Sequence, residues 1–98
     1  MKILTLKDAI KEKSRDPEFK EAYDRELMIN EIATLVVKLR KKAKLTQQEL
    51  ADRVGTKQSV IARLESGKNK RAPTIALLGR IAKASNAKLE VKFVQSKH

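Results

Sequence analysis

The residues best suited to recognition chemistry lie at the start of a predicted helix that spans residues 57–66. Lys57, Gln58 and Ser59 begin this helix, and Arg63 follows one turn later. A glutamine amide forms two hydrogen bonds with the edge of adenine, and an arginine guanidinium does the same with guanine. The four side chains are therefore predicted to contact bases in double-stranded DNA.

A basic loop follows this helix, and a second helix start precedes it. Lysine and arginine side chains bind phosphates as charges, and the free backbone N–H groups at the start of a helix attract anions. Contacts of this kind fix the position of a protein on DNA without reading its sequence. The predicted phosphate contacts are Thr46, Gln47, Lys68, Asn69, Lys70 and Arg71.

Two short helices joined by a tight turn would hold these residues in place. The sequence from Thr46 to Glu49 is a capping box, which starts a helix, and Gly55 and Gly67 suit the left-handed residue that ends one. Ala51 is small enough to let two helices cross closely. The predicted shared core consists of Leu50, Val54, Ile61 and Leu64. This spacing predicts a helix-turn-helix over residues 45–67, with the outer face of its second helix left free.

The sequence before this motif is predicted to be helical. Residues 5–8 resemble a capping box that opens a short helix through about residue 15. Asp16 and Pro17 form a clearer start, because aspartate caps helices and proline suits their first position. Helical periodicity then continues to about residue 43, either as one helix or as two with a break near residues 28–30.

The sequence after the motif predicts one more helix and a strand. Pro73 and Thr74 begin a helix that ends near Ser85, with Asn86 as a left-handed cap. Apolar and polar residues alternate over residues 88–94, which predicts a strand with one apolar face. A single short strand needs a partner, which we expect in an N-terminal segment such as residues 2–4, in a second copy or in another protein's sheet.

Charge favours a polyanionic partner, most often a nucleic acid. The 98-residue chain, enough for one small domain, has 23 basic and 12 acidic side chains and a net charge of +11. Residues 1–33 have seven basic and eight acidic side chains (net −1), and residues 34–98 have sixteen and four (net +12). The basic excess therefore belongs to the predicted helix-turn-helix region, and the N-terminal third forms a different surface.

The sequence predicts neither an enzyme nor a cofactor or metal site. It has no cysteine, its one histidine is His98, and its three glycines form no phosphate-binding loop. The acidic residues lack the spacing of metal ligands. No apolar run resembles a signal peptide or a membrane span, so we expect a cytoplasmic protein.

The motif resembles the XRE family of helix-turn-helix proteins, which includes the lambdoid phage repressors and Cro. The resemblance covers about residues 35–84 and is carried by the stretches 45–51, 54–56 and 61–67. It implies an all-α, five-helix domain that binds a pseudo-palindromic operator as a dimer, with a buried ion pair between Arg40 and Glu65. Many members have glycine where this chain has Lys44, and a left-handed lysine costs about 1 kcal/mol more than glycine.

The whole chain is similar to HigA-type antitoxins of bacterial toxin–antitoxin operons. The similarity rests on residues 16–23 before the domain and on residues 89–93 after it. It implies a nucleoid-associated repressor of its own operon that also neutralises a HigB/RelE-like mRNA-cleaving toxin, as a homodimer or a toxin–antitoxin heterotetramer. Phe19, Tyr23 and Leu27 form the helix face expected to bind the toxin. Packing against the protein's own core or against a dimer mate is an equal alternative for these three residues.

These observations predict three regions and leave two rival functions. The regions are an N-terminal helical extension over residues 1–33, a DNA-binding domain over residues 34–86, and a strand and tail over residues 87–98. The first rival is a stand-alone phage- or plasmid-type regulator without a toxin partner. The second is an interaction module of the transcription machinery that uses the same fold without reading DNA.

Overall fold

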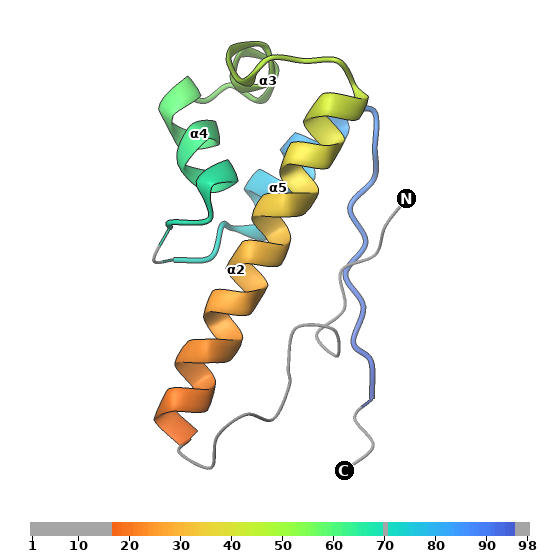
Figure 1. Ribbon diagram of the computed structural model, residues 1–98. Helices are drawn as coiled ribbons and strands as arrows, with labels where there is room; N and C mark the ends of the chain where they lie inside the picture. Colours follow the sequence, from red (N-terminus) through yellow and green to blue (C-terminus); the bar gives the residue numbers. More distant parts are fainter. Residues whose placement is uncertain (1–16, 70, 96–98) are drawn as a thin grey trace.

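A computed structural model of the protein describes residues 17–69 and 71–95. This part of the chain forms four α-helices joined by short turns and loops, followed by an extended segment (Figure 1). The helices are α2 (Pro17–Lys42), α3 (Gln47–Val54), α4 (Gln58–Ser66) and α5 (Ile75–Ala84). The helix expected over residues 5–15 lies outside the described residues.

Helix α2 is a single helix of 26 residues, so of the two alternatives the one without a break near residues 28–30 is confirmed. The sequence explains its continuity, because no glycine or proline follows Pro17 within it. Its buried residues are Ile29, Ile32, Ala33 and Val36, and none of its first twelve residues is buried. The first half projects away from the other helices, so α2 has a packed end and a projecting end (Figure 1).

The helix-turn-helix forms where the sequence predicts it. Thr46 caps α3: its hydroxyl accepts a hydrogen bond from the Glu49 N–H at 3.0 Å, and its own N–H donates to Glu49 Oε1 at 2.9 Å. Gly55 ends α3 in the left-handed region with φ 84°, and Gly67 ends α4 with φ 70°. The two glycines thus set the short lengths of both helices.

Three helix ends share one form, in which a left-handed residue is followed by an N–H that donates five residues back. The donors and acceptors are Leu45 to Arg40 at 3.1 Å, Thr56 to Ala51 at 2.9 Å, and Ala87 to Ala82 at 2.8 Å. The left-handed residues are Lys44 with φ 59°, Gly55, and Asn86 with φ 59°. The expected left-handed conformation of Lys44 and of Asn86 is therefore confirmed.

The core lies between the helices of the motif and their two neighbours. Helix α3 packs against α4 and α5, and α2 packs against α4. Leu50, Ala51 and Ile61 are fully buried, and Leu64 and Ile81 expose 1% each. Ala51 is fully buried in this core, so a larger side chain there would have to displace its neighbours.

The five-helix count and the C-terminal strand are not confirmed. Among the described residues there are four helices and no strand, and residues 87–95 are extended with a single β-bridge at Lys92. Val91 exposes 63% of its surface and Phe93 exposes 85%, so the alternating apolar face is not buried as expected. The period-2 pattern favours extended backbone over a further helix, but a strand also needs a neighbouring strand to complete its hydrogen bonds.

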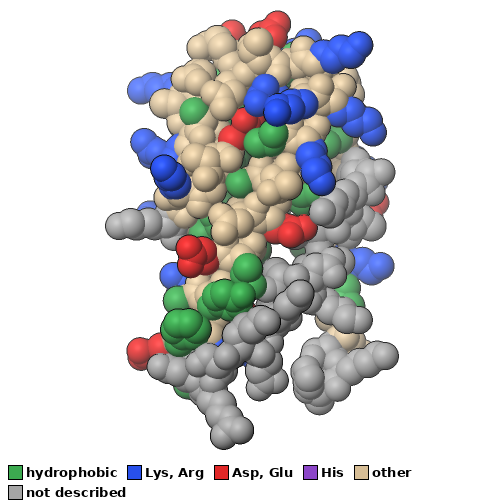
Figure 2. All heavy atoms as spheres, in the orientation of Figure 1, with side chains coloured by type: hydrophobic (Ala, Val, Ile, Leu, Met, Phe, Trp, Pro, Cys, Tyr) green, Lys and Arg blue, Asp and Glu red, His purple; other side chains and the backbone are tan. Residues whose placement is uncertain are grey.

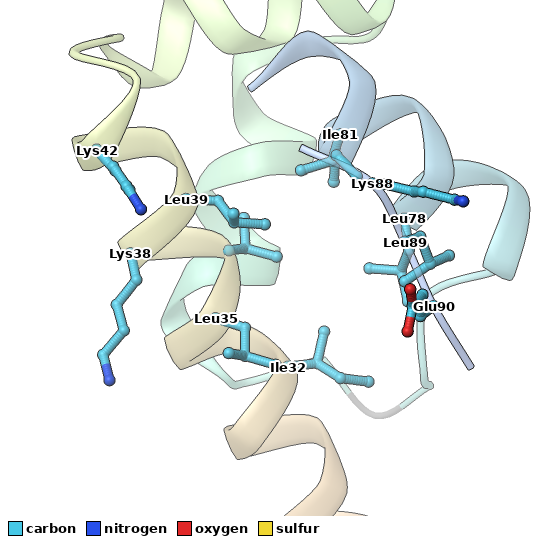
Figure 3. A pocket seen from close by; sticks show the side chains of 12 residues that line it. Ile32, Leu35, Lys38, Leu39, Lys42, Leu78, Ile81, Lys88, Leu89 and Glu90 are labelled. Atoms are coloured by element: carbon cyan, nitrogen blue, oxygen red, sulfur yellow. The ribbon is translucent and has the colours of Figure 1, made fainter. Parts of the chain in front are cut away.

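Helices α2 and α5 do not close fully on each other. Between them lies a mainly apolar cavity of about 270 Å³, with Leu89 of the extended segment at its edge (Figure 3). Leu35 and Leu39 of α2 face Leu78 of α5 across it, and Lys38 lies at its rim.

In the part of the chain that the structure describes, no helix is both long and apolar enough to cross a membrane.

Candidate nucleic-acid interface

Helix α4 presents one face to the core and the opposite face to solvent. Figure 1 looks along the axis of α3 while α4 runs across the picture, so the two helices cross steeply. Ile61 and Leu64 point inward, whereas Ser59 and Arg63 are exposed. Lys57, the N-cap of α4, is also exposed, and Gln58 is half-buried. The four predicted base contacts therefore lie at the accessible start and outer side of one short helix.

Positive charge surrounds this outer face. Arg63 lines a shallow hollow together with Lys68 and Arg71 of the following loop and Thr74 at the start of α5. Asn69 lines the same hollow and is half-buried, and Lys70 lies outside the described residues. Lysine and arginine side chains are spread over the end of the molecule formed by α3, α4 and the second half of α2 (Figure 2). The loop thus brings the cations Lys68 and Arg71 beside Arg63.

The ion pair between Arg40 and Glu65 forms, and it joins α2 to α4. Arg40 Nε lies 2.6 Å from Glu65 Oε2, and Nη2 lies 3.0 Å from Oε1. Only 14% of the Arg40 side chain and 5% of the Glu65 side chain are exposed. A third donor, Arg40 Nη1, binds the carbonyl of Leu45 at 2.8 Å. One guanidinium therefore fixes α4, α2 and the loop before α3 relative to each other.

Arg40 stays charged in this setting. Its hydrogen bonds to Glu65 raise its pKa above the ordinary value, burial acts in the opposite direction, and the charge of Glu65 raises the pKa further. The guanidinium is thus a permanent bidentate donor to the carboxylate.

The ion pair continues into a chain of side-chain amides. Gln47 Nε2 donates to Glu65 Oε1 at 3.1 Å, and Gln58 Nε2 donates to Gln47 Oε1 at 2.7 Å. The predicted phosphate contact Gln47 and the predicted base contact Gln58 therefore touch each other. Gln47 begins α3 and Gln58 begins α4, so the steep crossing of these helices brings their first residues together.

Sequence reasoning missed two features of this surface. It identified Gln47 as a phosphate contact but not as the link between Glu65 and Gln58, because the three residues are 18 and 11 positions apart. It also passed over Ala62, which is half-buried one turn after Gln58. The four-residue spacing from Gln58 places Ala62 on the same face, where a small apolar side chain can contact a thymine methyl group.

The residues expected to bind a toxin lie on the projecting half of α2. The Phe19 and Tyr23 rings stack with centroids 6.3 Å apart and an interplanar angle of 8°. Phe19 exposes 56% of its surface, and Tyr23 and Leu27 are half-buried. Hydrophobic and acidic groups mark this end of the molecule, in contrast to the basic end (Figure 2). The three residues are spaced four apart, so they follow one side of α2.

Comparison with known proteins supports the motif. The chain is 41% identical over 61 residues to an uncharacterised HTH-type transcriptional regulator of Archaeoglobus fulgidus, which covers 62% of this chain and 83% of that protein. A second uncharacterised HTH-type transcriptional regulator of the same organism is 38% identical over 61 residues, covering 62% and 84%. No solved structure matches the chain. Residues 36–91, more than half of the chain, match the helix-turn-helix family, and the chain therefore belongs to that family.

Proposed function

We propose that this protein is a transcriptional regulator that binds double-stranded DNA in a sequence-dependent way, with α4 in the major groove. The observation that carries the proposal is the outer face of α4, where Ser59 and Arg63 are exposed while Ile61 and Leu64 anchor the helix. A helix with its side chains is about 10–12 Å wide, which matches the major groove of about 12 Å. Its two similar relatives carry the description of transcriptional regulators.

The two kinds of contact have separate places in this arrangement. Lys57, Gln58, Ser59 and Arg63 contact bases. The phosphate contacts flank them on both sides, at Thr46 and Gln47 before α4 and at Lys68, Asn69, Lys70 and Arg71 after it. The net charge of +12 over residues 34–98, from sixteen basic and four acidic side chains, attracts the duplex at long range.

Selection from a library of randomised duplexes tests this proposal. Protein-bound duplexes are enriched over several rounds and sequenced, and the affinity of the enriched duplex is compared with that of random duplex at 50 and 200 mM salt. We expect at least a thousandfold preference for the enriched sequence and weaker binding of both duplexes at higher salt. Absence of binding to any duplex at 50 mM salt would contradict the proposal and favour an interaction module that does not read DNA.

We further propose that two copies bind one operator. A single nine-residue helix reads only a few base pairs, and two copies on half-sites about 34 Å apart read a palindrome on one side of the duplex. The enriched sequences should then contain inverted repeats about 10 base pairs apart. Single, unrepeated motifs bound by one copy would contradict the dimer.

The projecting half of α2 favours a second binding activity, as the antitoxin of a basic HigB/RelE-like toxin. Residues 17–28, which precede the first buried residue of α2, have four acidic and two basic side chains (net −2), next to the stacked rings of Phe19 and Tyr23. Acidic charge around an apolar patch suits a basic protein partner. Under the rival hypothesis, a stand-alone regulator, this half of α2 has no toxin to bind.

Co-expression separates the two hypotheses. The partner is the product of any directly adjacent gene that encodes a basic protein of roughly 100 residues, the ordinary size of a small domain. The antitoxin hypothesis predicts a complex that survives size exclusion and is weakened by Tyr23→Ala, whereas Ser59→Ala on α4 leaves it intact. Separate elution of the two proteins, or the absence of such a neighbouring gene, would leave the stand-alone regulator as the function.

A further inference from the structure

The cavity between α2 and α5 is a gap in the packing of the described residues. It has a volume of about 270 Å³, and aliphatic side chains from both helices form its walls, among them Leu35, Leu39, Leu78 and Ile81 (Figure 3). The three leucines are only half-buried. Protein interiors hold few voids larger than one water molecule, and apolar walls offer water no hydrogen bonds. The cavity is therefore suited to apolar side chains from another segment.

The extended C-terminal segment, residues 87–95, forms one edge of this cavity. It starts beside the packed end of α2 and runs toward the projecting end, with Leu89 at the cavity (Figures 1 and 3). It has a single β-bridge, at Lys92, and the backbone of residues 88–95 forms no hydrogen bond with another residue of the described ranges. An extended backbone of this kind accepts a further strand, which would complete its hydrogen bonds.

Outside the described ranges, the chain offers one stretch with apolar side chains. Residues 70 and 96–98 are Lys, Ser, Lys and His, whereas residues 1–16 include Ile3, Leu4 and Leu6. Isoleucine and threonine favour extended backbone, and neither glycine nor proline occurs in residues 1–16. Residues 2–5, which precede the helix expected from residue 5 onward, are therefore the best candidate for the missing strand.

The length of the N-terminal stretch matches the distance to the cavity. At about 1.5 Å per residue, α2 places Ile32 about 22 Å and Leu39 about 33 Å from Pro17. The helix expected over residues 5–15 would cover about 15 Å, and each extended residue beside it adds about 3.3 Å, so Ile3 and Leu4 would reach about 25–28 Å. A fully extended stretch would reach farther, so the cavity is within reach in either form.

We propose that residues 2–5 dock as a strand on residues 88–94, and that a side chain at position 3 or 4 fills the cavity between α2 and α5. Successive side chains of a strand point to opposite faces, so one of these two neighbours faces the cavity and the other faces away. Attachment to the same chain gives the strand an effective concentration of about a millimolar. The N-terminal stretch is then a part of the DNA-binding domain that ties the C-terminal segment to α2.

Disulfide formation in the full chain tests this proposal, because the chain has no cysteine of its own. Two double variants pair the neighbours with the cavity edge, Ile3→Cys/Leu89→Cys and Leu4→Cys/Leu89→Cys. The matched control is Leu4→Cys/Asp52→Cys, since Asp52 is exposed on α3 and does not line the cavity. Each variant is oxidised at low protein concentration in a glutathione buffer, and the products are separated on non-reducing gels and weighed by mass spectrometry.

We expect one of the two Leu89→Cys pairs to form a disulfide within one chain at least about tenfold faster than the other pair and the control, because Cβ atoms that point apart cannot be bridged. Similar rates in all three variants would overturn the proposal. A disulfide that joins two chains would also overturn it, since the strand of a second copy would then occupy the cavity.

Amide hydrogen exchange examines the docked strand without cysteines. The backbone amides of residues 88–94 should exchange at least about tenfold more slowly in the wild-type protein than in Ile3→Ser/Leu4→Ser, because opening a paired strand limits exchange. Ile10→Ser is the matched control, an apolar residue made polar outside residues 2–5, and should leave these amides as they are in the wild-type protein. Equal exchange of these amides in the wild-type protein and in Ile3→Ser/Leu4→Ser would show that residues 2–5 do not cover the segment.

Discussion

The pairing of Arg40 with Glu65 puts two charges where water reaches little of either side chain, at 14% and 5% exposure. Removing one partner leaves the other desolvated, which in proteins costs about 3–5 kcal/mol. We expect Glu65→Ala to lower the free energy of unfolding by about that amount, measured by urea denaturation. Arg53→Ala removes an exposed arginine that binds the Ala84 carbonyl at 3.3 Å, and should cost less than about 1 kcal/mol. Equal effects of the two changes would contradict the account.

At Lys44 the backbone conformation, rather than the side chain, determines the outcome of a substitution. Its φ of 59° is strained for a residue with a Cβ atom, and its side chain is exposed. Lys44→Gly should therefore raise the free energy of unfolding by about 1 kcal/mol. Lys41→Gly, the same change inside the last turn of α2, should lower it by a similar amount. A destabilising Lys44→Gly would show that the left-handed conformation is not the source of the strain.

Gly67 combines a left-handed backbone with a close approach to α2. A Cβ atom added there would lie 2.7 Å from Asn30 Oδ1, and φ is 70°. Gly67→Ala should lower the free energy of unfolding by at least about 1 kcal/mol. Gly79→Ala is the matched control, because nothing lies within 4 Å of its added Cβ and alanine favours the helical interior, so stability should rise. Thermal denaturation of both variants measures these changes in stability. An unchanged stability of Gly67→Ala would be inconsistent with this contact.

At the scale of the helices, the capping box at the start of α3 should make stability depend on pH. The hydrogen bond from the Thr46 backbone N–H lowers the pKa of Glu49 most, and a hydrogen bond with the Thr46 side chain lowers it further. A carboxyl group with a lowered pKa in the folded state stabilises the protein above the ordinary glutamate range, near pH 4, and this contribution is lost as the pH falls further.

Denaturation at pH 7 and pH 3 measures this effect. The wild-type protein should lose more stability on acidification than Glu49→Gln, which cannot titrate at this position. Thr46→Ala should cost about 0.5–2 kcal/mol at pH 7, since it removes the cap. The same acid sensitivity in the wild-type protein and in Glu49→Gln would assign the pH dependence to other carboxylates.

The helices of the motif were predictable because their signals are local. Thr46 and Glu49 are three residues apart, and Gly55 and Gly67 mark helix ends by their own backbone freedom. The Arg40–Glu65 pair spans 25 residues and came from the family resemblance, since nothing local to either residue predicts it. The link from Glu65 through Gln47 to Gln58 was missed because it depends on how steeply α3 crosses α4.

The C-terminal strand was the least predictable element. Alternation at Leu89, Val91 and Phe93 specifies which side chains share a face, but pairing depends on a strand elsewhere. In the described part of the chain, Val91 and Phe93 remain exposed. The continuity of α2, by contrast, was readable in principle from the absence of glycine and proline after Pro17.

At the scale of the whole molecule, charge and shape divide the protein into two ends. The basic end contains α3, α4 and the loop at Lys68 and Arg71, and the projecting half of α2 forms the acidic and apolar end (Figures 1 and 2). Helix α2 spans both, because it runs without interruption through residues 33 and 34. The three-region division of the chain stays a prediction. The proposed DNA binding of the basic end is the part of it that experiment can test most directly.

The most direct test of the central claim compares Arg63→Ala with Lys68→Ala on the enriched and the random duplex. Both side chains are exposed at the same hollow, but only Arg63 lies on α4. Arg63→Ala should weaken binding to the enriched duplex by about 1–3 kcal/mol with little effect on random duplex, because a base contact is lost. Lys68→Ala should weaken both duplexes equally and reduce the salt dependence by about one unit. Equal weakening of both duplexes by Arg63→Ala would contradict the reading of DNA by α4.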